Sequence, residues 1–312
     1  MIVCMPSTHP SLLVRFRPEK NHELQVRAFS RFKTKIMDDV DHPSSVIHHP
    51  RHPSPPPRHP RLVMVGSVRD IGDSERVLSL AALAIHLHLS CILVILESDV
   101  IMKNIPIPSS TPSIIIHSVD EMRASSIIHH PTIHAMDIVI IINCPYVSLL
   151  SWYSRASIGM HSMPEEHFGI GIVEMMAAGL VVIAHHSGGP MMDIVVPAVV
   201  VKTVKKGNIH TGSDEKIQVF SNFGLDPDRE LEEVPDPADP ASDPMRSSIG
   251  YLANTVEEYS TALSLAVRHV RGGGDTAQRV RQSVMDRFSD RTFERKFIDV
   301  VTLCLDEKER RG

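Results

Sequence analysis

The sequence predicts an α/β fold built on a doubly wound parallel sheet. Runs of β-branched apolar residues, such as RLVMVGS at 61–67 and LVVIAH at 180–185, have the length and composition of buried strands. Segments with helical periodicity separate these runs along the chain. The 312 residues are 42% hydrophobic, which is enough for a large core. Strands that alternate with helices favour a parallel sheet that is covered on both faces.

The first elements follow this alternation. LLVRF at 12–16 has the composition of a strand, and HELQVRAFSRF at 22–32 has a helical period. That period places Leu24, Ala28 and Phe32 on one face of the expected helix.

The next strand, RLVMVGS, ends in a turn at Gly66. A helix is expected after it, with Asp73 or Ser74 as its N-cap because a short polar side chain can accept a hydrogen bond from the free N–H groups there. The runs at 91–96 (CILVIL) and 138–143 (IVIIIN) both have strand composition. Either or both could supply the following strand.

The second half of the chain continues the pattern and ends in helices that the glycines of RGGGD interrupt. The expected elements are a helix at 148–156, a strand at 157–161, a helix at 171–179, a strand at 180–185 and helices within 256–305.

Three segments do not fit the alternation, and we interpret them as surface inserts with low-complexity character, partly disordered. They cover residues 41–60, 98–136 and 205–246. The first is dense in proline, which blocks both helical and ladder hydrogen bonds, and the last contains an acidic, proline-rich stretch. The remaining chain, 12–305, is expected to form one domain.

Composition excludes several classes of protein. The net charge is −5, from 37 acidic and 32 basic residues, and only 4% of the residues are aromatic, so neither bulk attraction to nucleic acid nor a base-stacking surface is expected. No apolar run approaches the roughly 18–20 residues that span a bilayer. Cys4, Cys91, Cys144 and Cys304 form no CxxC pair, and several of the 19 histidines lie in His-Pro runs without zinc-ligand spacing, so no metal site is predicted.

The segment PEEHFGIGIVEMMAAG carries two glutamates, Glu166 and Glu174, around a glycine-containing run. A helix is expected to begin near Gly169 or Gly171, and its free N–H groups and partial positive charge suit phosphate oxygens. Carboxylates accept hydrogen bonds from sugar hydroxyls, so the pattern fits an extended sugar-nucleotide ligand. A plain structural role, with Glu166 as a cap and Glu174 solvated, explains the same residues.

A basic run, VRFRPEKNH, follows the first predicted strand. Arg15, Arg17 and Lys20 would lie where a parallel sheet presents its ligand crevice, and arginine and lysine are suited to phosphate. A solvated turn is the alternative for such a run. Two sugar-nucleotide features at the ends of strands favour the binding site.

The spacing E-x7-E together with FRPEKNH resembles the donor-binding domain of retaining glycosyltransferases of the GT-B architecture. The blocks ASIGMHSM, EHFGIGIVEMMAAG and AHHSGGPMMDIVVP resemble more closely the α-1,2-mannosyltransferases that extend the dolichyl-diphosphate-linked oligosaccharide from GDP-mannose. Further similarity, as at LVMVGSVRD, carries the resemblance intermittently over residues 12–305. It implies a Rossmann-like, nucleotide-sugar-binding domain.

The resemblance implies roles for the residues of the E-x7-E segment. Glu174 matches the glutamate expected at the ribose hydroxyls. Glu166 matches the catalytic position near the mannose hydroxyls and the reacting centre. Phe168, Gly169 and Ile170 match the backbone stretch that lies against the donor sugar and the diphosphate.

It also implies donor-binding roles outside that segment. Arg15 or Arg17, with Lys20, matches the basic pair that neutralises the departing diphosphate, and Gly66 matches a glycine lining the cleft. Because these side chains carry the positive charge, neither a metal ion nor another cofactor is expected beside the donor substrate.

The resemblance implies GDP-mannose as donor, a dolichyl-diphosphate oligosaccharide as acceptor, and the cytosolic face of the endoplasmic reticulum membrane as the location. Other mannosyltransferases of N-glycan assembly are possible partners, and nucleic acid is not one. The family carries an N-terminal acceptor domain with a membrane anchor, and because the motifs begin at residue 12 we expect both to be absent here. The sequence departs from the family at Pro164–Glu166, where Trp-Asn usually precedes the glutamate.

Other functions stay open at this stage. The chain could be a retaining GT-B transferase that uses another nucleotide sugar, or a non-catalytic fragment that binds one. A Rossmann-type dehydrogenase is disfavoured because no GxGxxG follows a strand near the N-terminus.

Overall fold

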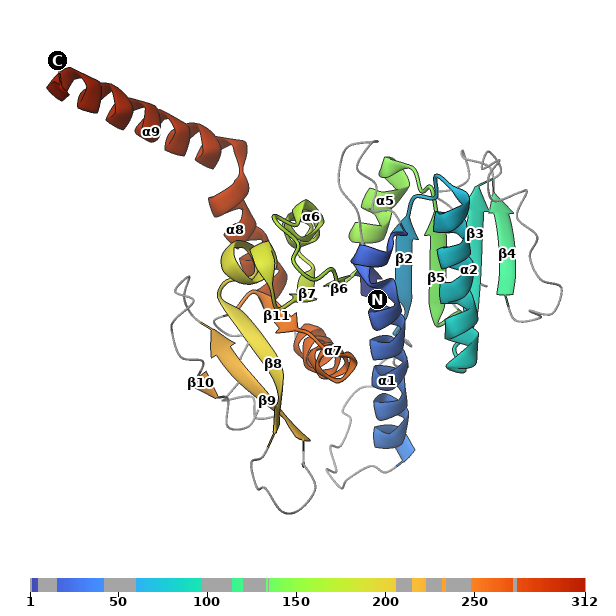
Figure 1. Cartoon of the computed structure of the whole chain (residues 1–312). Helices are drawn as coiled ribbons and strands as arrows, with labels where there is room; N and C mark the ends of the chain where they lie inside the picture. The colour runs from blue at the N-terminus through green and yellow to red at the C-terminus, as the bar shows by residue number, and fades with distance from the viewer. Residues whose placement is uncertain are drawn as a thin grey trace.

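In the computed structural model the strands form one twisted sheet, with helices packed on both of its faces (Figure 1). The structure describes residues 2–4, 16–41, 60–96, 114–119, 133, 135–205, 215–222, 232–233, 248–271 and 274–311.

The sheet is parallel except at one edge. Its order is β10-β9-β8-β11-β7-β6-β1-β2-β5-β3-β4, and only the pairs β8–β9 and β9–β10 run antiparallel. The strands are β1 (Ile2–Cys4), β2 (Leu62–Gly66), β3 (Cys91–Leu96), β4 (Ile114–Val119), β5 (Ile138–Ile142), β6 (Ile158–His161), β7 (Val181–His185), β8 (Ala198–Lys205), β9 (Glu215–Asn222), β10 (Glu232–Glu233) and β11 (Gly250–Ala253).

Helices connect most of these strands, as a parallel sheet requires. They are η1 (Pro18–Lys20), α1 (His22–Asp41), α2 (Ile71–His86), α5 (Tyr146–Tyr153), α6 (Ile170–Ala177), η3 (Pro190–Ile194), α7 (Val256–Arg271), α8 (Thr276–Phe288) and α9 (Asp290–Arg311).

The strand side chains divide between two cores. Leu62 and Met64 of β2 lie in a core that α1, α2 and α7 cover, whereas Val63 and Val65 lie in a second core that α5, α6 and α8 cover. All four side chains are buried. Successive residues of a strand point to opposite faces, so an uninterrupted apolar strand requires helices on both sides. This arrangement confirms the predicted doubly wound parallel sheet.

The helix predicted at 22–32 lies within α1, where Ala28 and Phe32 are buried and Leu24 is half-buried. Both open candidates, CILVIL and IVIIIN, are strands, β3 and β5. The predicted strand LLVRF falls outside the described residues except for Phe16, which is not in a strand.

The predicted cap of α2 was wrong. The helix begins earlier, at Ile71, and the side chain of Asp70 accepts a hydrogen bond of 2.8 Å from the backbone N–H of Asp73. Asp73 already lies inside the first turn, where its buried carboxylate pairs with Arg76. The correct cap is the Asp that precedes the helix, because only a residue in extended conformation can fold its side chain back onto the free N–H groups.

The predicted inserts contribute strands to the sheet. Residues 98–136 include β4, which pairs with β3, and residues 205–246 include β9 and β10, which extend the antiparallel edge. The described part of the first insert is limited to its end residues Asp41 and Pro60.

The order of the strands creates a switch point at β1. From β1 the chain adds β2 on one side, and later it adds β6 on the other side. In open parallel sheets, ligands bind outside the carboxyl ends of the strands at such a point. The fold therefore directs attention to the segments that follow β1 and β6.

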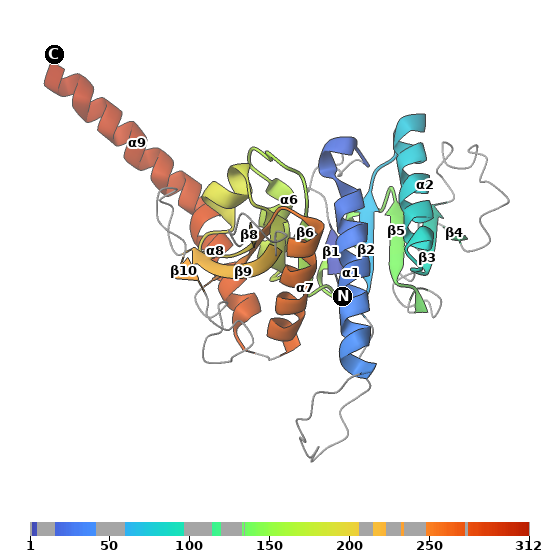
Figure 2. The same cartoon turned by 60° about the horizontal axis from the view of Figure 1, so that its bottom comes forward.

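The last helix, α9, extends away from the body of the molecule (Figures 1 and 2). Phe293, Phe297 and Leu303 are each more than half exposed on it. Within the described part of the chain, neither α9 nor any other helix is long and apolar enough to cross a bilayer.

We expect Phe29→Ala to lower the free energy of unfolding by about 3–5 kcal/mol, because the Phe29 ring is fully buried between α1 and the sheet. Urea unfolding followed by circular dichroism measures the change. Arg27→Ala, in the same helix but exposed and paired with Glu23 on the surface, is the matched control and should cost about 0.5 kcal/mol or less. Equal losses in the two variants would contradict the assigned packing.

Candidate functional site

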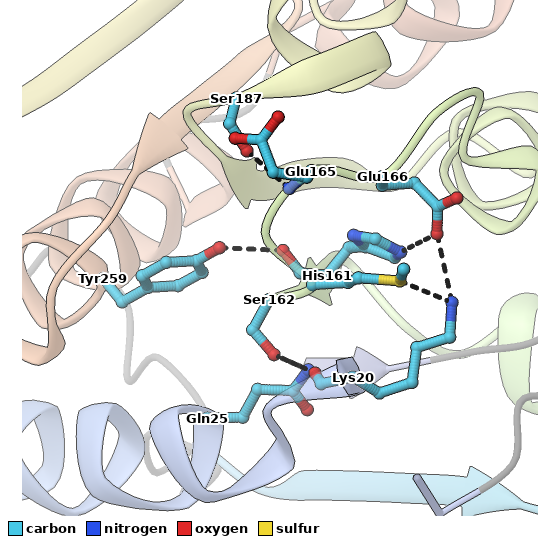
Figure 3. A network of polar contacts seen from close by, with 9 residues as sticks. Lys20, Gln25, His161, Ser162, Glu165, Glu166, Ser187 and Tyr259 are labelled. Atoms are coloured by element: carbon cyan, nitrogen blue, oxygen red, sulfur yellow. Dashed lines mark hydrogen bonds and ion pairs between the residues drawn. The ribbon is translucent and has the colours of Figure 1, made fainter. Parts of the chain in front are cut away.

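A lysine and a glutamate meet at the switch point. Lys20 ends η1, and Glu166 lies in the loop after β6. The Lys20 Nζ atom is 3.0 Å from Glu166 Oε2 and 3.1 Å from the sulfur of Met163 (Figure 3). Both charged side chains are less than a quarter exposed, so their attraction is screened less than that of a surface pair.

The local sequence explains how Lys20 reaches this position. Pro18 begins a single 3₁₀ turn, and its ring holds φ near the helical value. Asn21 ends the turn in the left-handed conformation (φ 49°), and its N–H donates to the Pro18 carbonyl at 3.0 Å. Helix α1 begins at the next residue, so the backbone turns sharply and projects Lys20 toward β6 (Figure 3).

His161, the last residue of β6, contacts the same carboxylate. Its Nε2 atom lies 3.3 Å from Glu166 Oε2, the oxygen that Lys20 also contacts. The backbone of His161 is fixed in turn, since the Tyr259 hydroxyl donates to its carbonyl at 2.8 Å. The Glu166 carboxylate is therefore held by one mobile cation and one buried ring.

A second polar contact joins the same two segments beneath the pair. The Ser162 hydroxyl lies 2.8 Å from the Lys20 carbonyl and 2.9 Å from that of Asn21, and it can donate to either. It accepts a hydrogen bond of 2.7 Å from the Gln25 amide in the first turn of α1 (Figure 3). This contact fixes η1 against the end of β6 independently of charge.

The electrostatics of the site favour an ionised Glu166. The hydrogen bond from His161, followed by the hydrogen bond and charge of Lys20, lowers the pKa of the Glu166 carboxyl from 4.5 to about 2 in spite of partial burial. Burial lowers the pKa of His161, which its bond to Glu166 only partly offsets. His22 nearby has a pKa near 3, because of burial first and then the charges of Lys20 and His161. At neutral pH these shifts favour an ionised Glu166 and neutral imidazoles at His161 and His22.

Two glycines give the loop its position. A Cβ atom at Gly188 would lie 2.4 Å from the Glu166 carbonyl oxygen, and one at Gly189 would lie 2.2 Å from that of His167. The N–H of Gly189 donates to the Glu166 carbonyl at 2.7 Å, and the N–H of Glu165 donates to the Ser187 hydroxyl at 2.9 Å. The sequence SGGP after β7 therefore serves as the surface on which the loop rests.

Helix α6 begins directly after the loop. Gly169 is its N-cap in the left-handed conformation (φ 84°), which confirms the predicted helix start. Phe168 and Ile170 on either side are nearly half exposed, and the Phe168 ring meets Phe288 edge-on at 5.7 Å. Glu174 lies in the second turn of α6 and is half-buried.

The structure brings together only some of the predicted site residues. Lys20 and Glu166 are in contact, and Phe168, Gly169 and Ile170 follow within four residues of that carboxylate.

Other predicted residues stay apart from this contact. Arg17 points to a cavity of about 530 Å³ between the start of α1 and α2, near Glu19, and neither Lys20 nor Glu166 lines that cavity. Gly66 is buried at the end of β2 rather than in a turn beyond it, and Arg15 lies outside the described residues.

Sequence reasoning missed His161, Ser162, Gln25 and Tyr259. One signal was available for His161, because a histidine that ends an apolar strand lies at the carboxyl edge where ligands bind. Gln25 and Tyr259 carry no such signal, since polar residues within a helical period are normally solvated.

No group of three or more His, Cys, Asp or Glu residues is arranged to hold a metal ion in the part of the chain that the structure describes. The expectation that catalysis needs no metal remains a prediction.

Residues 136–221, which contain β5, α5, β6, α6 and β7 with the Glu166 loop, match the family described as glycosyl transferases group 1. This segment is therefore similar to the group 1 glycosyltransferases. Lys20 lies outside the matched residues, so the structure adds a basic partner to the Glu166 carboxylate of the matched segment.

Several curated proteins resemble the chain. A human protein named GDP-Man:Man(3)GlcNAc(2)-PP-Dol alpha-1,2-mannosyltransferase is 34% identical over 59% of this chain and 25% of its own length. A Neurospora crassa protein of the same name is 32% identical over 59% of this chain and 22% of its length. A Dictyostelium discoideum protein, also of that name, is 24% identical over 96% of this chain and 37% of its length.

The chain therefore spans about a quarter of the length of the human relative that it matches. Among solved structures, Anabaena Alr3699/HepE in complex with UDP and glucose resembles it with a TM-score of 0.46 at 11% identity, over 96% of this chain and 48% of that chain.

The lowered pKa of Glu166 predicts an acid-labile contribution to stability. Because the folded pKa, about 2, lies below the usual 4.5, the contribution is fully present above pH 4.5 and is lost as the pH falls toward 2. We expect the difference in free energy of unfolding between the protein and Glu166→Gln to shrink by on the order of 3 kcal/mol over that interval.

Urea unfolding at a series of fixed pH values measures this difference. Glu165→Gln, which removes one charge from an exposed side chain of the same loop, is the control. If the protein and Glu166→Gln lost stability in parallel on acidification, the assigned contacts of Glu166 would be wrong.

Proposed function

We propose that this chain is the donor-binding part of a retaining glycosyltransferase that moves mannose from GDP-mannose, in α-1,2 linkage, to the dolichyl-diphosphate-linked precursor of N-glycans. The observation that carries the proposal is the contact of Lys20 with Glu166 at the switch point, close to the start of α6. Glu166 and α6 both lie within the residues that match the group 1 family. The names of relatives that are 31–34% identical over 59% of the chain support the choice of donor and acceptor.

The site offers one partner to each part of such a donor. The free N–H groups at the start of α6 and the Lys20 ammonium favour the diphosphate. Glu166 accepts hydrogen bonds from the mannose hydroxyls, and Glu174, in the second turn of α6, accepts those from the ribose hydroxyls. Phe168 and Ile170 supply exposed apolar surface beside the sugar.

The proposed reaction exchanges one bond at the anomeric carbon. The bond from mannose C1 to the phosphate oxygen breaks, and GDP departs with its electron pair. A hydroxyl oxygen of the acceptor bonds to C1 on the same face, and its proton passes to the departing phosphate. Lys20 stabilises the negative charge that develops on the diphosphate, so a divalent cation is not required. Arg15 or Arg17 would supply further positive charge, as the resemblance implies.

The acceptor and location follow from the same proposal. A dolichyl-linked acceptor is confined to a membrane, and the resemblance implies that the site works at the cytosolic surface of the endoplasmic reticulum. Association with other mannosyltransferases of the same assembly would keep the growing glycan close by. Nucleic acid is not an expected partner, because the negative net charge of the chain disfavours its binding.

Donor choice is the first test. We expect calorimetry to show tighter binding of GDP and GDP-mannose than of UDP, ADP or NAD. Lys20→Ala should weaken GDP more than guanosine, because the lost contact is to phosphate, and added salt should reduce the difference. Equal binding of all the nucleotides, or a preference for NAD, would refute the proposal.

Substitutions of the two glutamates should affect the affinities for GDP and GDP-mannose differently. Glu174→Ala should weaken GDP and GDP-mannose alike, by roughly 10- to 150-fold for a lost charge-assisted hydrogen bond. Glu166→Ala should weaken GDP-mannose selectively and leave GDP binding undiminished, because it frees the Lys20 ammonium. Glu165→Ala, on the exposed neighbour, is the matched control and should change neither affinity. Identical losses of GDP affinity in the first two variants, both folded by circular dichroism, would contradict this division.

A further inference from the structure

We propose that His161 is a positioning residue that keeps the Glu166 carboxylate in place for the donor sugar when the diphosphate draws Lys20 away. This inference rests on the proposed function. It assigns separate tasks to the two donors that share one oxygen of Glu166.

Both donors contact the same oxygen of the Glu166 carboxylate. Lys20 Nζ lies 3.0 Å and His161 Nε2 lies 3.3 Å from Glu166 Oε2, and the second carboxylate oxygen points away from both (Figure 3). A carboxylate held on one side only presents its other oxygen to a ligand. The arrangement orients Glu166 and leaves it an acceptor for sugar hydroxyls.

Lys20 and His161 differ in freedom. The ammonium of Lys20 ends a flexible four-carbon chain, and its other contact is the weak acceptor sulfur of Met163. A diphosphate carries more negative charge than one carboxylate, so it competes effectively for Lys20. His161 cannot follow, because its side chain is 9% exposed and its backbone is held by β6 and by the Tyr259 hydroxyl.

The imidazole of His161 is a neutral hydrogen-bond donor. The charged and titratable groups around it are Lys20, Glu166, His22 and His185. Burial and the Lys20 charge disfavour a protonated ring, whereas Glu166 favours it. The buried Nδ1 atom has no hydrogen-bond partner among the described residues, so the ring hydrogen is assigned to Nε2, toward Glu166. A neutral N–H donor orients the carboxylate without attracting the phosphates.

The test uses the full chain with His161→Leu, which removes the donor, and His161→Gln, which replaces it with an amide N–H. Calorimetry gives the ratio of GDP-mannose to GDP affinity for each. We expect His161→Leu to change GDP binding by less than about twofold and to weaken GDP-mannose about tenfold. His161→Gln should restore most of that loss, which a merely structural role would not predict.

A second readout follows the Glu166 carboxyl itself by carbon-13 NMR, assigned by comparison with Glu166→Gln. The pKa of Glu166 should rise in His161→Leu, and adding GDP should raise it further toward the usual 4.5 because Lys20 is then engaged. In the unaltered protein His161 should keep that pKa low with GDP bound.

The outcomes separate the two proposals. Unaltered protein that binds UDP or NAD as tightly as GDP and GDP-mannose would overturn the proposed function and this inference together. Preserved discrimination in folded His161→Leu, with an unchanged Glu166 titration, would overturn the role of His161 alone.

Discussion

The contact between Lys20 and Glu166 depends on almost every larger feature of the fold. The two residues are separated by 146 positions in the sequence, and they meet because β1 and β6 are neighbours with parallel carboxyl ends. A sheet wound in one direction only would send the two loops to different places. The ion pair therefore depends on this strand order, in which β1 and β6 are neighbours.

The support around this contact is divided between apolar and polar atoms. Two cores, one on each face of the sheet, fix the strands, and Tyr259 crosses from α7 to the end of β6 to fix its last carbonyl. The bond between Gln25 and Ser162 then sets the distance between α1 and the loop. Buried polar groups that satisfy each other specify one geometry, whereas apolar packing alone tolerates small shifts.

Much of this could be predicted from local sequence. Alternating apolar and periodic segments predicted the sheet and most helices, and the glycine before Ile170 predicted the start of α6. Gln25 could not be assigned, because its partner Ser162 lies 137 positions away, and His161 had only its place at the end of an apolar strand as a signal. The strand β9 was missed for a related reason: its pairing with β8 comes from a tertiary contact inside a segment of mixed composition. Arg17 was predicted to lie at the site because it belongs to the basic run. In the structure it lines a cavity that neither Lys20 nor Glu166 lines.

The glycines after β7 place a steric constraint on an unexpected part of the chain. The loop that carries Glu166 is held through backbone atoms, and Pro164 and Glu165 expose their side chains. Other side chains at those two positions would not displace the carboxylate. Gly188 and Gly189 have no such freedom, because any side chain there would displace the loop's carbonyls. The position of the loop thus depends on two residues that carry no functional group of their own.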